Sequence, residues 1–293
     1  MTHRFGLAFC LLLAGCQPPA PAAKPHYVAG AAWQADGVWH YPQDSLELNT
    51  TGVATIYRGA PQLTTDGEVY DATALTAAQQ TLALPAVARI TNLDNGLQVM
   101  VRINDRGPTD PGRIVAVTPR VANLLQFGPD GLAPVRLDVL TDESRAVAGV
   151  LPSGGGPTLE VGLAPVGAVQ QTELAPPDGA RQAEGRRAAA KLIAAASETT
   201  ATVVPQRLPE AVTRVPAVPG RVMIGAGSFS RREFADLRRI RLGGLAARID
   251  RVQTGRTVNF RVMLGPYNTV NDADSALRQA IDAGVTDAKI VVE

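Results

Sequence analysis

The chain has 293 residues, enough for one or two domains, and contains 45% hydrophobic but only 4% aromatic residues. Gly and Pro together supply 50 residues (28 and 22), which favours small folded units joined by loose segments over one large core. The net charge is only +1, so the overall charge of the chain does not attract it to a strongly charged partner such as nucleic acid.

The first fifteen residues have the features of a signal peptide. His3 and Arg4 precede an apolar run, residues 5–14, which is too short to span a bilayer. The run ends in Leu-Ala-Gly followed by Cys16, a pattern that resembles the lipobox of bacterial lipoproteins. The resemblance implies that residues 1–15 are removed and that Cys16 is acylated. An ordinary secretory signal with an incidental cysteine is the alternative.

The cysteine count agrees with a lipid anchor. Cys10 would leave with the signal, so Cys16 would be the only cysteine of the mature chain and no internal disulfide could form. Gln17, rather than Asp, follows it, and by analogy with such lipoproteins this indicates the periplasmic face of the outer membrane. Residues 16–25 are rich in Pro and Ala and are predicted to be a tether.

Residues 26–140 form the first predicted domain, in which short β-type runs alternate with turn signals. Two of these runs, residues 88–93 and 98–103, flank Asn95-Gly96. This dipeptide predicts a hairpin with a type I′ turn, in which both central residues have positive φ.

Two short helices are also predicted in this domain, at residues 74–79 and 119–126. Many short strands with little helix predict a small β-barrel. Residues 141–217 are rich in Gly, Pro, Ala and Val and are predicted to be a largely disordered linker, including the Ala- and Arg-rich residues 180–197.

Residues 218–293 form the second predicted domain, whose elements follow the order βαββαβ. The strands are expected at 221–226, 246–252, 257–264 and 288–292, and the helices at 231–242 and 271–283. Gly243-Gly244 and Gly284 end the two helices. This order predicts a four-stranded antiparallel sheet with both helices on one face and the other face free to bind a ligand.

Two local motifs in this domain are similar to each other. Residues 227–230 (Gly-Ser-Phe-Ser) end the first strand, residues 260–267 end the third, and each is followed by a polar segment and a helix. Together with the element order, they resemble a SPOR domain over essentially its whole length. The resemblance implies binding to glycan strands of peptidoglycan that have lost their peptide stems, often at division septa.

Three side chains of this domain are predicted to contact glycan. Phe229 and Tyr267 offer flat surfaces to sugar rings, with core packing as the alternative for both, and Arg261 is a candidate cation. Residues 221–293 contain twelve Arg or Lys against eight Asp or Glu, and a strand with exposed lactyl carboxylates is anionic. An RNA-binding module of the same topology needs stacking aromatics in mid-strand, and export removes the chain from RNA, so no nucleic acid is expected.

The first domain carries a longer set of motifs. Residues 75–85, 88–93 and 102–108 (Arg-Ile-Asn-Asp-Arg-Gly-Pro) resemble the rare lipoprotein A family. Further similar segments are residues 39–42, 64–71 and 112–115. The resemblance covers about residues 26–140. It implies a six-stranded double-psi β-barrel, followed here by the α+β, ferredoxin-like SPOR domain.

The resemblance also implies lytic transglycosylase activity, which cleaves peptidoglycan glycan strands to leave 1,6-anhydro-muramyl ends. A glycoside hydrolase usually needs two carboxyl groups, but here the C6 hydroxyl of the sugar is the nucleophile and one acid–base group suffices. Asp105 is the predicted acid–base residue, with a turn or ion-pair role as its alternative. The family motif places Glu68 and Asp71 near the groove, with a solvated turn and a helix cap as their alternatives.

Three barrel side chains are predicted to contact substrate: Tyr57, Gln79 and Arg106. The chain also departs from the family pattern. Gln79 and the residue after it replace a His-Lys pair, Ala116 replaces an Asp, and the run at residues 54–58 lacks the usual Trp.

These departures favour a competing function, a wall-binding or division-site lipoprotein without catalysis. A third alternative is a septal scaffold that contacts division-site proteins through residues 141–217. Neither a metal nor another cofactor is expected, because the three histidines are not at metal-ligand spacing.

Overall fold

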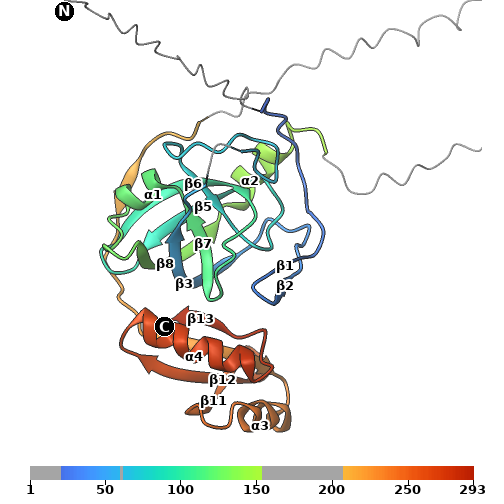
Figure 1. Ribbon diagram of the computed structural model, residues 1–293, viewed down its shortest axis with the longest axis vertical. Helices are drawn as coiled ribbons and strands as arrows, with labels where there is room; N and C mark the ends of the chain where they lie inside the picture. Colours follow the sequence, from blue (N-terminus) through green and yellow to red (C-terminus); the bar gives the residue numbers. More distant parts are fainter. Residues whose placement is uncertain (1–20, 60–61, 154–206) are drawn as a thin grey trace, which may run out of the picture.

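The computed structural model describes residues 21–59, 62–153 and 207–293, which form a barrel and a C-terminal domain (Figure 1). The predicted signal peptide, Cys16 and most of the predicted linker lie outside these residues. Within the described part of the chain, no helix is both long and apolar enough to cross a membrane.

Six strands close into the barrel. They are β3 (Asn49–Ile56), β4 (Thr76–Ala78), β5 (Ala86–Asn92), β6 (Leu97–Asp105), β7 (Arg113–Val117) and β8 (Leu132–Val139). They follow the order β4-β7-β3-β8-β5-β6, and β6 pairs back with β4. The pairs β3–β7 and β4–β6 are parallel, and the others are antiparallel. The predicted six-stranded barrel is confirmed.

One of the two helix predictions for this domain is wrong. Residues 74–79 contain the strand β4 rather than a helix, because they pair with β6 on one side and β7 on the other and so close the barrel. Good helix formers such as Ala77 and Ala78 yield here to tertiary pairing. The second helix is confirmed as α1 (Pro119–Leu124), which begins with a proline in its first turn.

The hairpin between β5 and β6 is confirmed, but its turn type is not. Positive φ falls on Gly96 alone in this turn (71°), whereas a type I′ turn needs positive φ at Asn95 as well. The loop has four residues between the strands. The side chain of Asn95 accepts a hydrogen bond from the Leu97 N–H (2.9 Å) and donates one to the Leu125 carbonyl (3.0 Å).

Two segments of the predicted linker are secondary structure. Helix α2 (Thr141–Ala148) packs on the barrel, where the hydroxyl of Ser144 accepts a hydrogen bond from the Val87 N–H (2.9 Å). Strand β9 (Val212–Arg214) pairs with β6 and extends the sheet beyond the closed barrel. The chain therefore returns across the barrel before it enters the C-terminal domain.

The C-terminal domain has the predicted βαββαβ order. Its elements are β10 (Val222–Phe229), α3 (Arg232–Arg241), β11 (Ala247–Thr254), β12 (Thr257–Tyr267), α4 (Val270–Asp282) and β13 (Lys289–Val292). The sheet order is β11-β12-β10-β13, and every pair is antiparallel. Ala235 of α3 and Leu277 of α4 share one core with Val262 of β12, so both helices cover one face as predicted.

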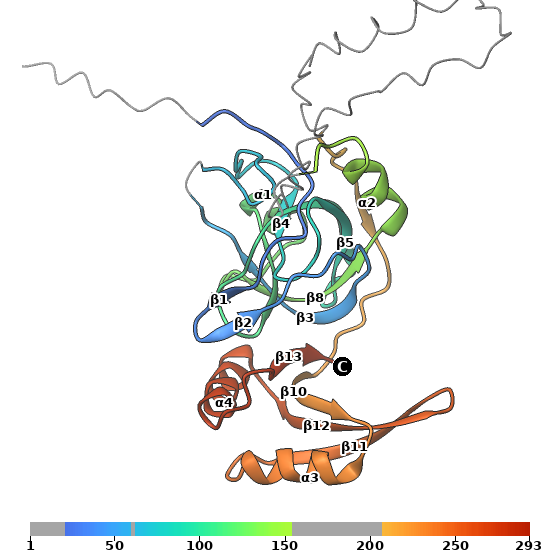
Figure 2. The same ribbon diagram turned by 90° about the vertical axis from the view of Figure 1, so that its right-hand side faces the viewer.

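The two domains contact each other directly, with β13 nearest to β3 (Figure 2). The guanidinium of Arg113 makes two hydrogen bonds of 2.7 Å to the carboxylate of Asp274 on α4. The hydroxyl of Thr51 donates to the Val292 carbonyl (2.7 Å). Val53 of the barrel is fully buried within the hydrophobic core of the C-terminal domain. The junction is thus packed with apolar side chains as well as linked by an ion pair.

A glycine permits this close approach. Gly112 has a φ of +77°, and a Cβ at this position would lie 2.6 Å from Cδ2 of Leu277 on α4. A side chain is therefore disfavoured both by the backbone conformation and by the space available. On the barrel side of the junction, the hairpin of β1 (Trp33–Ala35) and β2 (Val38–His40) lies over the C-terminal domain (Figure 2).

Candidate functional site

Asp105 is the last residue of β6, where the strand leaves its pairing with β4 and the side chain becomes half-buried. Its Oδ1 accepts hydrogen bonds from the Thr65 N–H (3.0 Å), the Thr65 hydroxyl (2.7 Å) and the Arg106 N–H (2.8 Å). Among the described residues, Asp105 forms no ion pair. Three donors hold its Oδ1, and the Tyr57 hydroxyl lies close enough to the carboxylate to hydrogen-bond with it.

The turn that carries Thr65 is organised by a buried carboxyl that sequence reasoning missed. Oδ1 of Asp66 accepts hydrogen bonds from the Thr64 hydroxyl (2.8 Å) and the Glu68 N–H (3.1 Å). Burial, followed by the negative charge of Glu68, raises the pKa of Asp66 to about 7. Gly67, with a φ of +82°, brings the turn against the Lys24 backbone, where a Cβ would lie 2.2 Å from the carbonyl oxygen.

Glu68 is buried in an ion pair rather than solvated. Its Oε1 lies 2.7 Å from Nε of Arg102, and both side chains are only 9% exposed. The amide of Asn104 donates to Oε2 (2.8 Å). Both oxygens are thus engaged, and Glu68 is one half of a buried ion pair beside the groove.

Asp71 lies at the surface of the same loop. Its Oδ1 accepts from the N–H and the hydroxyl of Thr73 (2.8 and 2.6 Å), and Arg207 pairs with its Oδ2. The Thr73 hydrogen bond, aided by Arg207, lowers the pKa of Asp71, although burial opposes this. Asp71 caps no helix, because the helix expected at residues 74–79 is a strand.

The three predicted carboxyls line two neighbouring hollows. A cavity of about 320 Å³ is lined by Glu68 and Asp71, and a hollow of about 10 Å³, which has room for about one water molecule, is lined by Asp105. Thr76 and Asn104 line both, so the two adjoin and together form the candidate groove. Across the described residues, no group of three or more His, Cys, Asp or Glu is placed to hold a metal ion.

Tyr57 lies at the Asp105 end of this groove, as predicted for a substrate contact. Its ring packs edge-on against Tyr70, with the ring centres 5.0 Å apart. Its hydroxyl accepts a hydrogen bond from Gln62 (3.0 Å). Burial raises the pKa of Tyr57, and so do the negative charge of Asp105 and a hydrogen bond to its carboxylate, whereas the Gln62 hydrogen bond opposes the shift. The hydroxyl therefore stays protonated beside Asp105.

The other two barrel predictions, Gln79 and Arg106, are engaged in structural contacts. Gln79 is 5% exposed, and its Oε1 accepts hydrogen bonds from the N–H groups of Thr81 (2.7 Å) and Leu82 (2.8 Å). The guanidinium of Arg106 points away from the carboxylate next to it and donates to the carbonyls of Ala29 and Leu82. Burial lowers the pKa of Arg106 to about 10. These contacts favour structural roles over the predicted sugar contacts.

In the C-terminal domain, Phe229 and Tyr267 pack against the hydrophobic core, as their alternative interpretation had it. The Arg238 guanidinium lies 5.3 Å from the centre of the Phe229 ring. Arg261 lies on the open face of the sheet, where it pairs with Glu293 and lines a cavity of about 460 Å³. Of the three predicted glycan contacts in this domain, only Arg261 lines that cavity.

Comparison with known proteins matches the barrel to a family described as "Lytic transglycolase", over residues 49–137. Three proteins named endolytic peptidoglycan transglycosylase RlpA are similar to the chain. The one from Rickettsia bellii is 29% identical, with 50% of this chain and 77% of that protein covered. The one from Neisseria meningitidis serogroup B is 36% identical, and the match covers 50% of this chain and 63% of that protein, which is less than two thirds of its length. The one from Pseudomonas aeruginosa is 27% identical, and the match covers 88% of this chain and 82% of that protein.

Among solved structures, the chain matches the crystal structure of the RlpA SPOR domain from Pseudomonas aeruginosa. The match covers 24% of this chain and 96% of that one, at 20% identity and a TM-score of 0.23.

Proposed function

Because the chain belongs to the RlpA family, we propose that it is a lytic transglycosylase that cleaves peptidoglycan glycan strands. The preferred substrate is a strand without stem peptides, and the products carry 1,6-anhydro-muramyl ends. Asp105 is the proposed acid–base residue.

The reaction needs one group that first gives and then takes a proton. In the proposed step, the Asp105 carboxyl donates a proton to the glycosidic oxygen as the bond from C1 of the muramyl sugar breaks. The C6 hydroxyl of the same sugar then attacks C1, and its proton returns to the Asp105 carboxylate. No water is consumed, and Asp105 ends in its starting state.

The observation that carries this proposal is the position of the Asp105 carboxyl at one end of a groove. Its Oδ1 is held by three hydrogen bonds, and the Tyr57 hydroxyl lies beside the same carboxylate. Glu68, paired with Arg102, and Asp71, paired with Arg207, line the groove further along. The Tyr57 hydroxyl is available to orient the substrate.

The test uses the purified chain and peptide-free glycan strands, with products identified by mass spectrometry. We expect anhydro-muramyl ends from the wild type and none from Asp105→Asn, which keeps the shape of the side chain but cannot transfer the proton. Asp142→Asn is the matched control, because the Asp142 side chain lies on α2 and is 97% exposed. Binding to glycan without any anhydro product would leave a wall-binding protein and refute the enzyme.

The envelope location is part of the same proposal. A lipid on Cys16 would anchor the protein at the periplasmic face of the cell envelope, most simply in the outer membrane, with enrichment at division septa and contact with division-site proteins. The support is the sequence Leu-Ala-Gly-Cys after a short apolar run. Labelling with a palmitate analogue tests it: Cys16→Ser should lose both the label and the membrane association.

A further inference from the structure

A second groove crosses the junction of the two domains. One cavity of about 310 Å³ lies between the β1–β2 hairpin and the C-terminal domain, and another of about 460 Å³ lies on the open face of the C-terminal sheet. Thr50, Asp287 and Lys289 line both of them, so the two cavities form one path. Each has a volume typical of ligand clefts, roughly 300–1,000 Å³.

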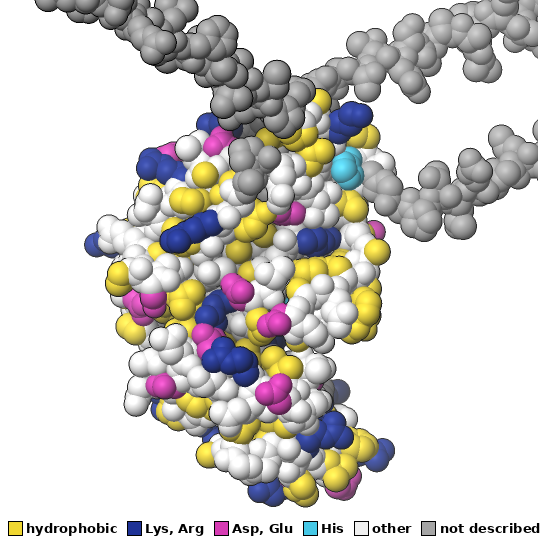
Figure 3. Space-filling view, in the orientation of Figure 1, with side chains coloured by type: hydrophobic (Ala, Val, Ile, Leu, Met, Phe, Trp, Pro, Cys, Tyr) yellow, Lys and Arg dark blue, Asp and Glu magenta, His cyan; other side chains and the backbone are white. Residues whose placement is uncertain are grey.

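The path has fixed walls, since the two domains that form it are held together. The two hydrogen bonds between Arg113 and Asp274, both side chains largely buried, lie beside it. Such a paired, partly buried link resists solvent screening better than an exposed one. Figure 3 shows acidic and basic side chains gathered on the face where the two domains meet.

An exposed aromatic platform forms the barrel side of the path. Trp39 lines the junction cavity and is 54% exposed, and it stacks with Tyr41, which is 64% exposed. An exposed indole costs hydration free energy unless a ligand covers it, and its flat face suits the apolar face of a sugar ring. His40 stacks on Trp33 with ring centres 4.6 Å apart, and burial lowers the pKa of His40, so the ring is neutral at pH 7.

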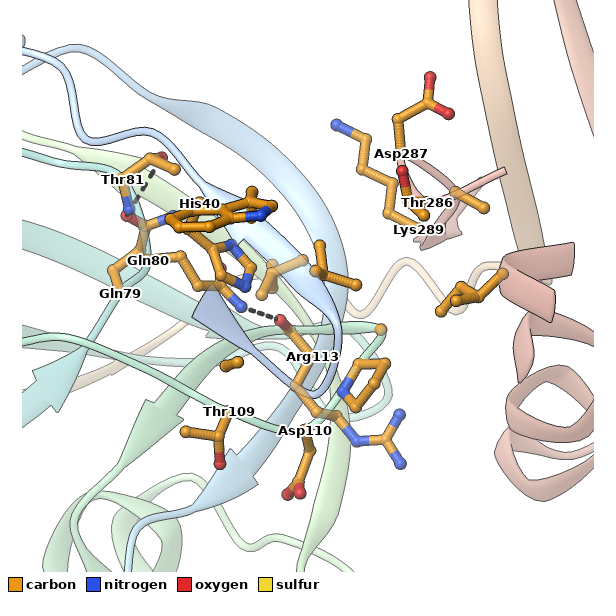
Figure 4. A pocket seen from close by; sticks show the side chains of 18 of the residues that line it. His40, Gln79, Gln80, Thr81, Thr109, Asp110, Arg113, Thr286, Asp287 and Lys289 are labelled. Atoms are coloured by element: carbon orange, nitrogen blue, oxygen red, sulfur yellow. Dashed lines mark hydrogen bonds between the residues drawn. The ribbon is translucent and has the colours of Figure 1, made fainter. Parts of the chain in front are cut away.

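The opposite side of the path carries a basic side chain. Figure 4 shows Lys289 and Asp287 facing His40 and Gln80 across the junction cavity. Asp287 is paired with Arg238, whereas Lys289 forms no ion pair within the described residues. An exposed ammonium group without a partner favours an anionic ligand.

Resting on the proposed function, we propose that this junction groove is a second glycan-binding site, which holds a distal part of the same strand that is cleaved. Its ligand is an anionic polysaccharide: Trp39 stacks on a sugar ring and Lys289 pairs with a lactyl carboxylate. The groove reaches Gln79, whose backbone N–H donates to the Asp105 backbone carbonyl (3.0 Å). The open sheet face, the junction and the barrel therefore act together on long strands.

The experiment measures the affinity of the full chain for peptide-free glycan strands of increasing length, in an Asp105→Asn background that leaves the strands intact. For long strands, Trp39→Ala should weaken binding roughly three- to tenfold, the effect of losing one stacking surface. Lys289→Ala should weaken it roughly two- to fivefold at low salt and less at high salt. Short oligosaccharides that occupy one domain alone should show at most one of the two effects.

Matched controls lie on α3, away from the groove. Phe234→Ala removes an aromatic ring that is 48% exposed, and Arg241→Ala removes an exposed cation. Both should bind long strands like the parent. Arg113→Asp should weaken long-strand binding by separating the domains, and the charge-swapped pair Arg113→Asp with Asp274→Arg should restore it.

The outcomes separate this proposal from the function on which it rests. If Trp39→Ala and Lys289→Ala bind long strands as tightly as the α3 controls, the junction groove is refuted, whatever the wild type cleaves. If both variants weaken binding while the wild type yields no anhydro ends, the groove stands and the enzyme fails.

Discussion

Replacing Asp66 by Asn tests whether a buried carboxyl makes the barrel less stable as the pH rises. Asp66 has no exposed surface, and its pKa is raised to about 7 from 3.8, first by burial and then by the charge of Glu68. The folded barrel therefore holds a proton that the unfolded chain has already released. The amide introduced by Asp66→Asn would keep the acceptor for Thr64 and for the Glu68 N–H but would not titrate.

The sign and size follow from linkage. A raised folded-state pKa contributes stability that is complete below pH 3.8 and is lost as the pH rises through about 7. Each pKa unit corresponds to about 1.36 kcal/mol, so a shift of about three units gives an upper limit of ~4 kcal/mol. A new unpaired amide hydrogen in the variant would add a cost that does not change with pH.

The assay is urea denaturation of the full chain, wild type against Asp66→Asn, at several values from about pH 5 to about pH 8. Because every other titrating group is present in both proteins, the difference in unfolding free energy reports the titration of Asp66 together with its interaction with the Glu68 charge. The variant should gain on the wild type by a few kcal/mol over this range. A difference that stays constant with pH would show that Asp66 is already ionised and refute the reasoning.

Three further changes have defined outcomes. Thr65→Val removes the side-chain donor to Asp105 and should lower the rate of glycan cleavage about tenfold, whereas Thr65→Ser keeps a hydroxyl and should cleave at about the wild-type rate. Equal cleavage rates in Thr65→Val and Thr65→Ser would contradict the positioning role. Arg102→Ala leaves the buried carboxylate of Glu68 without its partner and should lower the unfolding free energy, measured by urea titration, by about 3–5 kcal/mol. An unchanged unfolding free energy would show that the ion pair does not stabilise the barrel. Gly112→Ala places a Cβ against α4 and should undock the domains, seen as a larger radius of gyration in X-ray scattering; an unchanged radius would show that the junction adapts.

The C-terminal domain could be predicted from its sequence almost element by element. Its helices and strands are long, and glycines stop both helices: Gly243 and Gly284 have φ values of +37° and +82°. Local periodicity therefore agrees with the fold.

The barrel could be predicted as a class but not in its closing strand. Residues 74–79 have helix-forming composition, and only their pairing with β6 and β7, distant in sequence, makes them a strand. The same holds for the domain junction. Arg113 and Asp274 are 161 residues apart, and nothing in the local pattern of either indicates the other.

The candidate site shows a similar division. Asp105, Glu68 and Asp71 could be placed near one groove from their motif, but the partners of each could not. The buried ion pair of Glu68 and the inward carboxyl of Asp66 depend on tertiary packing. One local signal did exist: in the turn sequence Thr-Thr-Asp-Gly-Glu, an Asp side chain commonly accepts a hydrogen bond from the backbone N–H two residues later.

The two departures from the family pattern bear on which reaction the groove can support. Ala78 pairs with Ala116 on one side and with Asp105 on the other. Position 116 thus lies two strands from Asp105, about 10 Å from backbone to backbone at ~4.8 Å per strand. An alanine there supplies no group that could transfer a proton, and the Gln79 amide is held in its turn by the N–H groups of Thr81 and Leu82. Neither position therefore shares the acid–base work proposed for Asp105, and the proposed cleavage depends on that one carboxyl.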